Sequence, residues 1–432
     1  MAGHGHIAVI DSPVDCTVSV PGSKSIANRA LVCAALAGNG TEVANIPDGD
    51  DSVAMVHALR DLGLSVDEVA SGTMRFDGGI DLASDRFVRV DAKLAGTTSR
   101  FLTALCALRH GPSVIDGGEA LRARPMADLH DALAQLGGHV NPLDRTGHLP
   151  VEVSLGALRG GEISIPGGVS SQFTSALLLI APYLRGGLRL VVEGDRVSNS
   201  YIDMTVAVMR DFGAQIEMLE RADGLRLEIP EGRYESRYYA IEPDASSASY
   251  PLAIAAVAGG AVTIERLGTT SLQGDAAFAD VLALMGCRVD RGLDSITVRR
   301  DLSQPLKGID INMVDMSDLV PTVAAVGLFA VGPTRIRGVG FIRHKESDRL
   351  GDLTAELRKC GAGIVEVDDG LIIEPSPLVG AHLGTHHDHR LAMCFAVVAA
   401  RISGISIDDP AVVSKSWPGF WSAREAIAAS GR

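Results

Sequence analysis

An internal repeat constrains the fold of this chain more than any other feature, because six repeats of about 72 residues account for all 432 residues. Each repeat contains a helix-like stretch that ends at a glycine, a residue that tolerates the left-handed conformation with which many helices stop. These glycines are Gly63, Gly137, Gly213, Gly286, Gly361 and Gly431. They are spaced 74, 76, 73, 75 and 70 residues apart. Chance recurrence in a glycine-rich chain is the alternative, and such regular spacing disfavours it.

A second series of positions has the same period and marks the start of another helix in each repeat. These positions are Lys24, Thr97, Ser171, Ser246, Asp318 and His389. The helices that follow, such as residues 175–180 and 253–258, have no polar face and must be buried. The other helix of each repeat carries charges, and strand-like runs follow it. The sequence therefore predicts an α/β fold of six units in two lobes of three, each unit with one buried helix, one amphipathic helix and several strands.

Composition and charge exclude several classes of partner. The net charge of −14 disfavours nucleic acid and anionic membranes, and no apolar run approaches ~20 residues. The six cysteines form no Cys-x-x-Cys pair, and no export signal is evident at the N-terminus. We expect a cytoplasmic monomer with reduced thiols and no cofactor.

A short loop, Pro21-Gly22-Ser23-Lys24-Ser25, is similar to a phosphate-binding loop without being a nucleotide P-loop. Val18 and Ser23 occupy the positions at which that motif needs glycine. A glycine-serine turn before a helix nevertheless offers free backbone N–H groups and a positive helix end to an anion. Lys24 is therefore predicted to bind an anion other than a nucleotide.

The polar residues of the buried helices gather at their N-terminal ends. Helix capping explains the serines and Asp244. It does not explain Lys24 or Arg390, because a cation at a helix N-terminus opposes the helix dipole unless an anion is bound there. Further cations are expected on the same face of the two lobes. The whole set is Lys24, Arg29, Arg124, Lys345, Arg349, Arg390 and Lys415. The sequence thus predicts a cleft for substrates with several negative charges.

Two carboxylates, Asp318 and Glu346, lie among these cations. Structural salt bridges are one interpretation, and proton transfer is the other. The run His386-His387-Asp388-His389 is rich in potential ligands, but its spacing matches no standard zinc pattern, so no metal is predicted.

Nine motifs in order make the chain resemble the 5-enolpyruvylshikimate-3-phosphate synthases, which are enolpyruvyl transferases. The motifs are Pro21-Gly22-Ser23-Lys24-Ser25 with Asn28-Arg29, Leu94-Ala95-Gly96-Thr97, Arg124-Pro125, Val169-Ser170-Ser171-Gln172-Phe173, Ser198 with Tyr201-Ile202-Asp203, Asp244-Ala245-Ser246-Ser247-Ala248-Ser249-Tyr250, Lys345-Glu346-Ser347-Asp348-Arg349, Asp388-His389-Arg390 and Lys415-Ser416-Trp417-Pro418. The resemblance implies a two-lobed inside-out α/β barrel of six βαβαββ-type units, three in each lobe. Residues 1–20 and 243–432 are then expected to form one lobe and residues 21–242 the other, with hinge crossings near residues 21 and 243 and the active site in the cleft.

The resemblance also implies the reaction: transfer of the carboxyvinyl group of phosphoenolpyruvate to the 5-hydroxyl of 3-phosphoshikimate, with release of phosphate, in the shikimate pathway to aromatic amino acids. The residues implied for 3-phosphoshikimate are Lys24, Ser25, Arg29, Ser170, Ser171, Gln172, Ser198, Tyr201, Asp318 and Lys345. Those implied for phosphoenolpyruvate are Lys24, Gly96, Arg124, Gln172, Arg349, Arg390 and Lys415. The catalytic residues are expected to be Asp318, Glu346, Lys24 and His389.

The same resemblance implies the roles of the two carboxylates and shows two positions at which the chain differs from many family members. Asp318 is expected to be the base toward the 5-hydroxyl and Glu346 the acid toward C3 of phosphoenolpyruvate. Gly96 is the residue of family members that the herbicide glyphosate inhibits, so inhibition competitive with phosphoenolpyruvate is expected. Leu94 and Phe341 replace asparagines of many members, and Arg343 or His344 is a possible substitute near 3-phosphoshikimate.

Two alternatives have the same fold. One is the sister transferase that acts on UDP-N-acetylglucosamine, which usually relies on a loop cysteine near the position of Arg124. No cysteine lies between Cys106 and Cys287. The other is a non-catalytic anion-binding protein, which the presence of Lys24, Asp318 and Glu346 together disfavours.

Overall fold

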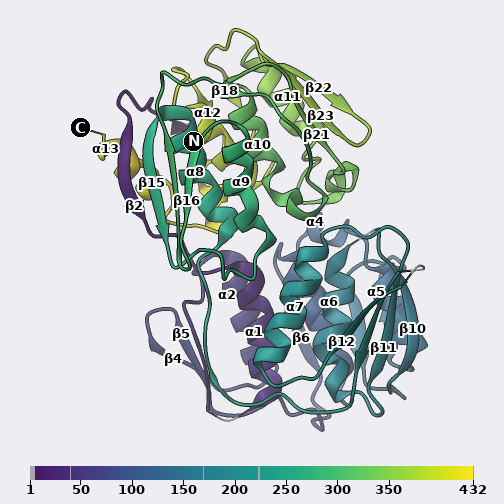
Figure 1. Ribbon diagram of the computed structural model, residues 1–432. Helices are drawn as coiled ribbons and strands as arrows, with labels where there is room; N and C mark the ends of the chain where they lie inside the picture. Colours follow the sequence, from purple (N-terminus) through teal and green to yellow (C-terminus); the bar gives the residue numbers. More distant parts are fainter. Residues whose placement is uncertain (1–4, 39, 169, 222–223, 432) are drawn as a thin grey trace. The chain divides into compact units, whose positions relative to one another are not determined.

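The chain divides into two compact units, each of which has its own core. The computed structural model describes residues 5–38, 40–168, 170–221 and 224–431 (Figure 1). We call Gly22–Ile241 the central unit, and Met1–Pro21 together with Glu242–Arg432 the terminal unit.

Three repeats form the central unit, each with one four-stranded sheet. The sheet orders are β14-β3-β5-β4, β6-β7-β9-β8 and β10-β11-β13-β12. In each, the first two strands in this order are parallel and the others antiparallel. The strands are β3 (Thr41–Ala44), β4 (Val66–Ala70), β5 (Thr73–Phe76), β6 (Val88–Asp91), β7 (Ser113–Asp116), β8 (His139–Pro142), β9 (Val151–Ser154), β10 (Gly161–Pro166), β11 (Leu188–Glu193), β12 (Glu217–Arg221), β13 (Gly224–Ile229) and β14 (Tyr238–Ala240). The helices are α1 (Lys24–Ala37), α2 (Asp50–Asp61), α3 (Gly96–Ala107), α4 (Glu119–Arg122), α5 (Ala127–Gln135), α6 (Ser171–Ile180), η1 (Ala181–Tyr183) and α7 (Asn199–Asp211).

The terminal unit repeats this plan with one shorter sheet. Its sheet orders are β16-β17-β15-β2, β19-β21-β23-β22 and β1-β25-β24, with a small β18-β20 pair besides. The strands are β1 (Gly5–His6), β2 (Val14–Val18), β15 (Gly260–Glu265), β16 (Arg288–Arg291), β17 (Ser295–Arg300), β18 (Leu306–Lys307), β19 (Asp310–Asn312), β20 (Ala330–Val331), β21 (Thr334–Arg337), β22 (Gly363–Val367), β23 (Gly370–Glu374), β24 (His382–Leu383) and β25 (Ser406–Ile407). The helices are α8 (Ala245–Ala258), η2 (Gly274–Ala277), α9 (Phe278–Leu284), η3 (Val314–Leu319), α10 (Val320–Gly327), η4 (Gly340–His344), α11 (Gly351–Lys359), α12 (His389–Val398), η5 (Pro410–Lys415) and α13 (Phe420–Ala429).

In each unit, one sheet has an edge strand that comes from a distant part of the chain. β14, near the end of the central unit, pairs in parallel with β3 near its start. β2, near the N-terminus, pairs in parallel with β15 of the terminal unit. The chain therefore passes between the units twice, after Pro21 and after Ile241. The backbone N–H of Asp244 donates to the Pro21 carbonyl at 2.8 Å. This hydrogen bond connects the two chain segments on the side of the terminal unit.

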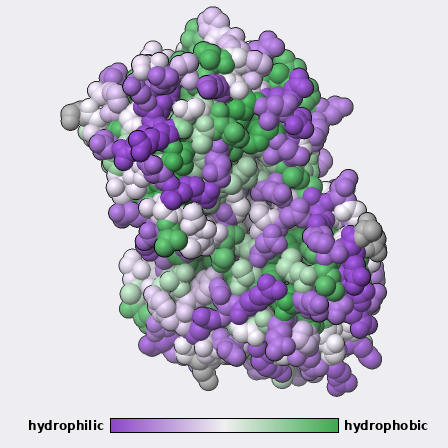
Figure 2. Space-filling model, in the orientation of Figure 1, coloured by the Kyte–Doolittle hydropathy of each residue, from purple (hydrophilic) through white to green (hydrophobic). Residues whose placement is uncertain are grey.

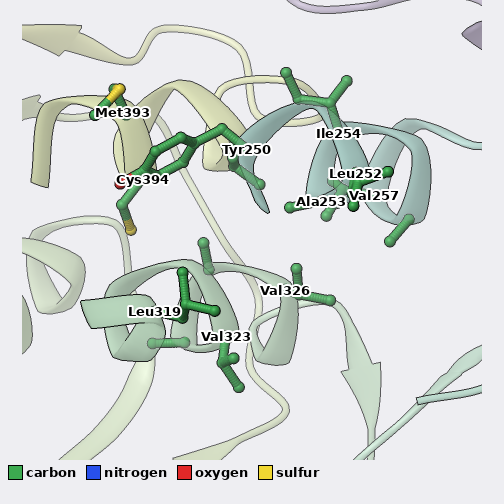
Figure 3. Close-up of a cluster of buried hydrophobic side chains, with 14 of the residues drawn as sticks. Tyr250, Leu252, Ala253, Ile254, Val257, Leu319, Val323, Val326, Met393 and Cys394 are labelled. Carbon is green, nitrogen blue, oxygen red and sulfur yellow. The ribbon is translucent and has the colours of Figure 1, made fainter. Parts of the chain in front are cut away.

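Three apolar helices form the centre of each unit. α1, α3 and α6 pack on one another in the central unit, as do α8, α10 and α12 in the terminal unit. Figure 3 draws buried side chains from all three helices of the terminal unit, including Ile254 of α8, Val323 of α10 and Met393 of α12. All fourteen residues of α8 are buried, and each large aliphatic side chain contributes roughly 1.5–3 kcal/mol. The predicted α/β fold with helices inside and sheets outside is confirmed. Among the described strands, pairing does not continue from sheet to sheet, so no single closed barrel forms.

Five of the six repeat-marking glycines act as left-handed helix stops, as the sequence predicts; the prediction is wrong for Gly431, which follows α13 without a positive φ. Gly63, Gly137, Gly213, Gly286 and Gly361 have φ values of 96°, 90°, 88°, 101° and 80°. Each follows the C-cap of an amphipathic helix, such as Leu62 of α2. An L side chain is strained at these angles, so the repeat of glycines reflects backbone geometry.

The outer surface carries the charge of the molecule. On the face in Figure 2, hydrophilic residues spread over each unit, and hydrophobic ones lie between them in small groups. All six cysteines are free thiols, and five of them are buried. No helix within the described ranges is long and apolar enough to cross a membrane.

His130 on α5 makes the stability of the central unit depend on pH. Its side chain is 4% exposed, and neither ring nitrogen has a hydrogen-bond partner among the described residues. Burial lowers its pKa from 6.5 to about 4. The unfolded chain therefore binds this proton at a higher pH than the folded chain, and stability falls as pH drops from 6.5 toward 4.

We expect His130→Leu to remove most of this pH dependence. At pH 5 the variant should be about 2 kcal/mol more stable than the parent chain, and at pH 7.5 equal or slightly more stable. Urea unfolding followed by circular dichroism at the two pH values measures the difference. An unchanged difference between the two pH values in the variant would contradict the assignment.

Candidate active site

The start of α1 places Lys24 beside a carboxylate. The Ser23 hydroxyl accepts from the Ile26 N–H at 3.4 Å and caps the helix. Lys24 Nζ lies 3.0 Å from Asp51 Oδ2, in the first turn of α2. The Thr98 hydroxyl of α3 donates to the Asp51 carbonyl at 3.1 Å. The starts of α1, α2 and α3 are therefore connected, with the cation at their meeting point.

Arg29 is buried inside the central unit. Its Nε donates to Thr205 Oγ1 at 2.7 Å, and its two Nη atoms donate to the Ser25 and Tyr201 carbonyls and to the Ser175 hydroxyl. Burial lowers its pKa to about 10, so it remains charged at neutral pH. These contacts connect α1, α6 and α7. The structure thus gives Arg29 a role in packing, and its predicted contact with 3-phosphoshikimate stays a prediction.

Gly96 and Arg124 lie against each other at the start of α3. A Cβ atom placed on Gly96 would be 2.7 Å from Arg124 Nη1 and 3.4 Å from Arg100 Nη1. Arg100 donates to Gln172 Oε1 and, at 3.3 Å, to the Pro125 carbonyl. Arg100 was missed by the sequence reasoning, although a buried cation one turn into an apolar helix is a signal that could have found it.

The starts of α6 and α7 supply the remaining polar groups of the central unit. The Ser170 hydroxyl accepts from the Gln172 N–H at 3.3 Å and caps α6, whose first residue, Ser171, is buried. Ser198 precedes α7 with φ 58°, a conformation that costs a non-glycine residue ~1–3 kcal/mol and is concentrated at functional sites. Tyr201 lies in the first turn of α7, with its ring 5.8 Å from the Arg29 guanidinium carbon.

Arg349 is the centre of the charged network in the terminal unit. It is 1% exposed, and its Nε lies 2.7 Å from Asp388 Oδ2. Its Nη1 lies 2.9 Å from Asp318 Oδ1, and its Nη2 lies 2.6 Å from Glu346 Oε2. Burial alone would lower the pKa of Arg349, but these three carboxylates raise it above its usual value. One guanidinium thus connects three carboxylates.

Asp318 accepts from three cations. Besides Arg349, Lys345 Nζ lies 3.2 Å from its Oδ1, and Arg390 Nη2 lies 2.7 Å from its Oδ2. Burial would raise the pKa of this carboxyl, but the three cations together hold it well below its usual value. Asp318 is therefore an ionised acceptor at neutral pH.

The start of α12 brings Asp388 and His389 to this network, and Lys415 lies in the neighbouring η5. Asp388 caps the helix by accepting from the Arg390 N–H at 2.9 Å, while its Oδ2 accepts from Arg349. His389 is buried, with Nδ1 3.6 Å from Asp388 Oδ1. Lys415 is buried at the end of η5, which packs on α12.

The two departures from the family pattern differ in their surroundings. Phe341 lies under Lys345, whose Nζ is 5.9 Å from the ring centroid. Arg343 forms an ion pair with Glu366 of β22 and donates to the Val367 carbonyl, so it is engaged on the sheet side of η4. Leu94 is exposed and lines a cavity of about 590 Å³ in the central unit.

No group of three or more His, Cys, Asp or Glu side chains within the described ranges has the geometry to hold a metal ion. His386 of the histidine-rich run instead contacts α11, where its Nε2 lies 2.9 Å from Glu356 Oε1.

Comparisons with known proteins identify the family of the chain. A family profile described as EPSP synthase (3-phosphoshikimate 1-carboxyvinyltransferase) matches residues 9–423. The 3-phosphoshikimate 1-carboxyvinyltransferase of Nostoc sp. is 41% identical over 422 residues, which are 96% of this chain and 97% of that protein. The enzyme of that name from Methanoculleus marisnigri is 41% identical over 420 residues, 95% of this chain and 96% of that protein.

A solved EPSP synthase from Acinetobacter baumannii has the same fold, with a TM-score of 0.80 at 24% identity over 98% of this chain and 97% of that one. The fold and these relatives define an enzyme of the carboxyvinyl transferase class. The chain belongs to the EPSP synthase (3-phosphoshikimate 1-carboxyvinyltransferase) family.

Proposed function

We propose that the chain transfers the 1-carboxyvinyl group of phosphoenolpyruvate to the 5-hydroxyl of 3-phosphoshikimate by addition and elimination. The 5-hydroxyl gives its proton to a base as its oxygen bonds to C2 and a proton is added at C3. The tetrahedral intermediate then loses phosphate from C2 and a proton from the C3 methyl group, which restores the carbon–carbon double bond. The observation that carries the proposal is that Arg349 contacts both Asp318 and Glu346, and that Asp318 also accepts from Lys345 and Arg390. An addition that removes one proton and delivers another needs two such groups.

Asp318 suits the base, because its pKa is held low and it is ionised before substrate binds. Glu346 suits the acid toward C3. It forms an ion pair with Arg349, while Lys345, Arg349 and Arg390 stabilise the charge of Asp318. Bound substrate anions offset the local cations and so favour a protonated Glu346.

We further propose that residues of both units bind the same two substrates. Phosphoenolpyruvate carries a phosphate and a carboxylate on adjacent atoms, and arginine forks bind both groups through paired hydrogen bonds. Arg124 of the central unit, with Arg349, Arg390 and Lys415 of the terminal unit, is assigned to it. The helix starts at Lys24, Ser170 and Ser198 are assigned to 3-phosphoshikimate. The chain is expected to act as a cytoplasmic monomer, and its free thiols suit a reducing compartment.

A phosphate-release assay tests this function against the sister reaction. The purified chain with phosphoenolpyruvate should release phosphate when 3-phosphoshikimate is added, and should release none above background with UDP-N-acetylglucosamine. Activity with the UDP-sugar alone would favour the sister transferase. Binding of both anions without phosphate release would favour the non-catalytic alternative.

Glyphosate should inhibit this activity competitively with phosphoenolpyruvate, and Gly96→Ala should weaken the inhibition. The added methyl group would contact Arg124 Nη1 at 2.7 Å, so the guanidinium must move away from the bound anion. We expect at least about a tenfold rise in the inhibition constant, equivalent to about 1.4 kcal/mol, and a smaller rise in KM for phosphoenolpyruvate. Steady-state inhibition kinetics measure both.

Gly232→Ala is the matched control, because nothing lies within 4 Å of a Cβ atom at that position. It should leave both constants unchanged. An inhibition constant in Gly96→Ala equal to that of the parent chain would contradict the prediction.

A further inference from the structure

A buried carboxyl that the mechanism does not use contacts the proposed substrate site indirectly, through a serine hydroxyl. Asp275, in η2, is 5% exposed and accepts a hydrogen bond from the Ser246 hydroxyl in the first turn of α8. Arg390 Nη2 lies 3.5 Å from the same hydroxyl oxygen and 2.7 Å from Asp318 Oδ2. A chain of polar contacts therefore runs from Asp275 through Ser246 to Arg390.

The direction of these hydrogen bonds is determined by the groups involved. A serine hydroxyl has one proton to donate and two lone pairs. A guanidinium can only donate. Since Asp275 receives the hydroxyl proton, a lone pair of Ser246 faces Arg390. Without Asp275, the hydroxyl is free to rotate and turn its proton toward the cation.

We propose that Asp275 is a positioning residue that orients Ser246 and thereby holds Arg390 in place for phosphoenolpyruvate. The inference rests on the proposed function in one respect, the assignment of Arg390 to that substrate. Asp275 touches no substrate in this account and acts through two other side chains.

The surroundings of Asp275 explain why a carboxyl suits this position. η2 packs against α8, α9 and η3, whose charged groups are Asp244 at the cap of α8, Asp280, Asp315 and Asp318. Burial, and next to it the charge of Asp318, raises the pKa of Asp275 to about 7. Its Oδ1 has no hydrogen-bond partner among the described residues, and Oδ2 is the atom that accepts from Ser246. Asparagine, a neutral acceptor of the same shape, should therefore replace it well.

Steady-state kinetics on four variants test the proposal. Asp275→Ala and Ser246→Ala should each raise KM for phosphoenolpyruvate about tenfold, the scale of a hydrogen bond to a charged group. KM for 3-phosphoshikimate and kcat should change less than about threefold. The double variant should be no worse than either single one, because both remove the same chain of contacts. Asp275→Asn should restore KM to within about threefold of the parent value.

Asp280→Ala is the control. Asp280 lies on α9, where its carboxylate forms an ion pair with Arg291 of β16. If Asp275→Ala fails to fold, the KM values of Ser246→Ala and Asp275→Asn for phosphoenolpyruvate test the proposal. An unchanged KM for phosphoenolpyruvate in Ser246→Ala, or an Asp275→Asn variant as impaired as alanine, overturns the proposal. These results are read only against an active parent chain, and an inactive parent contradicts the proposed function instead.

Discussion

Replacing Glu346 by glutamine is expected to lower kcat by a factor of about 10²–10⁴, the usual contribution of a positioned general acid. An amide cannot deliver a proton to C3 of phosphoenolpyruvate. Its carbonyl oxygen can still accept from Arg349 Nη2, as the carboxylate does at 2.6 Å. Binding of both substrates should therefore change less than about threefold, which separates a chemical role from a structural one.

Single-turnover kinetics and isothermal titration with each substrate measure the two effects separately. Glu425→Gln, on the exposed side of α13, is a matched control and should match the parent chain in both assays. A kcat within tenfold of the parent value in Glu346→Gln would remove Glu346 from the proposed mechanism.

Replacing Arg349 by alanine is expected to damage both the stability of the terminal unit and its activity. The change leaves Asp318, Glu346 and Asp388 close together without the guanidinium they share. Removing one partner of a buried ion pair costs about 3–5 kcal/mol. The value of kcat/KM for phosphoenolpyruvate should fall at least about 10³-fold, because Asp318 and Glu346 both lose their orientation. Lysine should restore little, since one ammonium group cannot replace a planar fork.

Tryptophan fluorescence during urea unfolding is a suitable measurement, because the only two tryptophans of the chain, Trp417 and Trp421, belong to the terminal unit. Arg337→Ala is the control. It breaks the half-exposed pair with Asp310, and such pairs contribute at most about 1 kcal/mol. Equal losses of stability in the two variants would contradict the central role of Arg349.

The repeat and the outline of the fold could be predicted because they depend on local signals. In five of the six repeats the amphipathic helix stops at a glycine with positive φ, and each central helix is apolar on all sides beyond its first turns. Both properties appear in the residues themselves, without knowledge of what they touch. The shorter third sheet of the terminal unit, which β1 completes, has no such local signal.

Side-chain partners could be predicted much less well. Arg29 lies in the second turn of α1, where nothing in the local sequence distinguishes it from an exposed arginine, yet it is buried against Thr205 and Ser175. Arg100 and Asp275 were missed because their importance comes from Gln172 and Ser246, which are distant in the sequence. Long-range neighbours of this kind depend on how the repeats pack, which the sequence pattern alone does not specify.

The most direct test of the account follows the bond that breaks in phosphoenolpyruvate. The substrate is labelled with ¹⁸O at the oxygen between C2 and phosphorus and is incubated with 3-phosphoshikimate and the parent chain. Addition and elimination at C2 breaks the carbon–oxygen bond, so the account predicts that the released phosphate carries the label. Unlabelled phosphate, with the label in pyruvate, would show cleavage at phosphorus and contradict carboxyvinyl transfer.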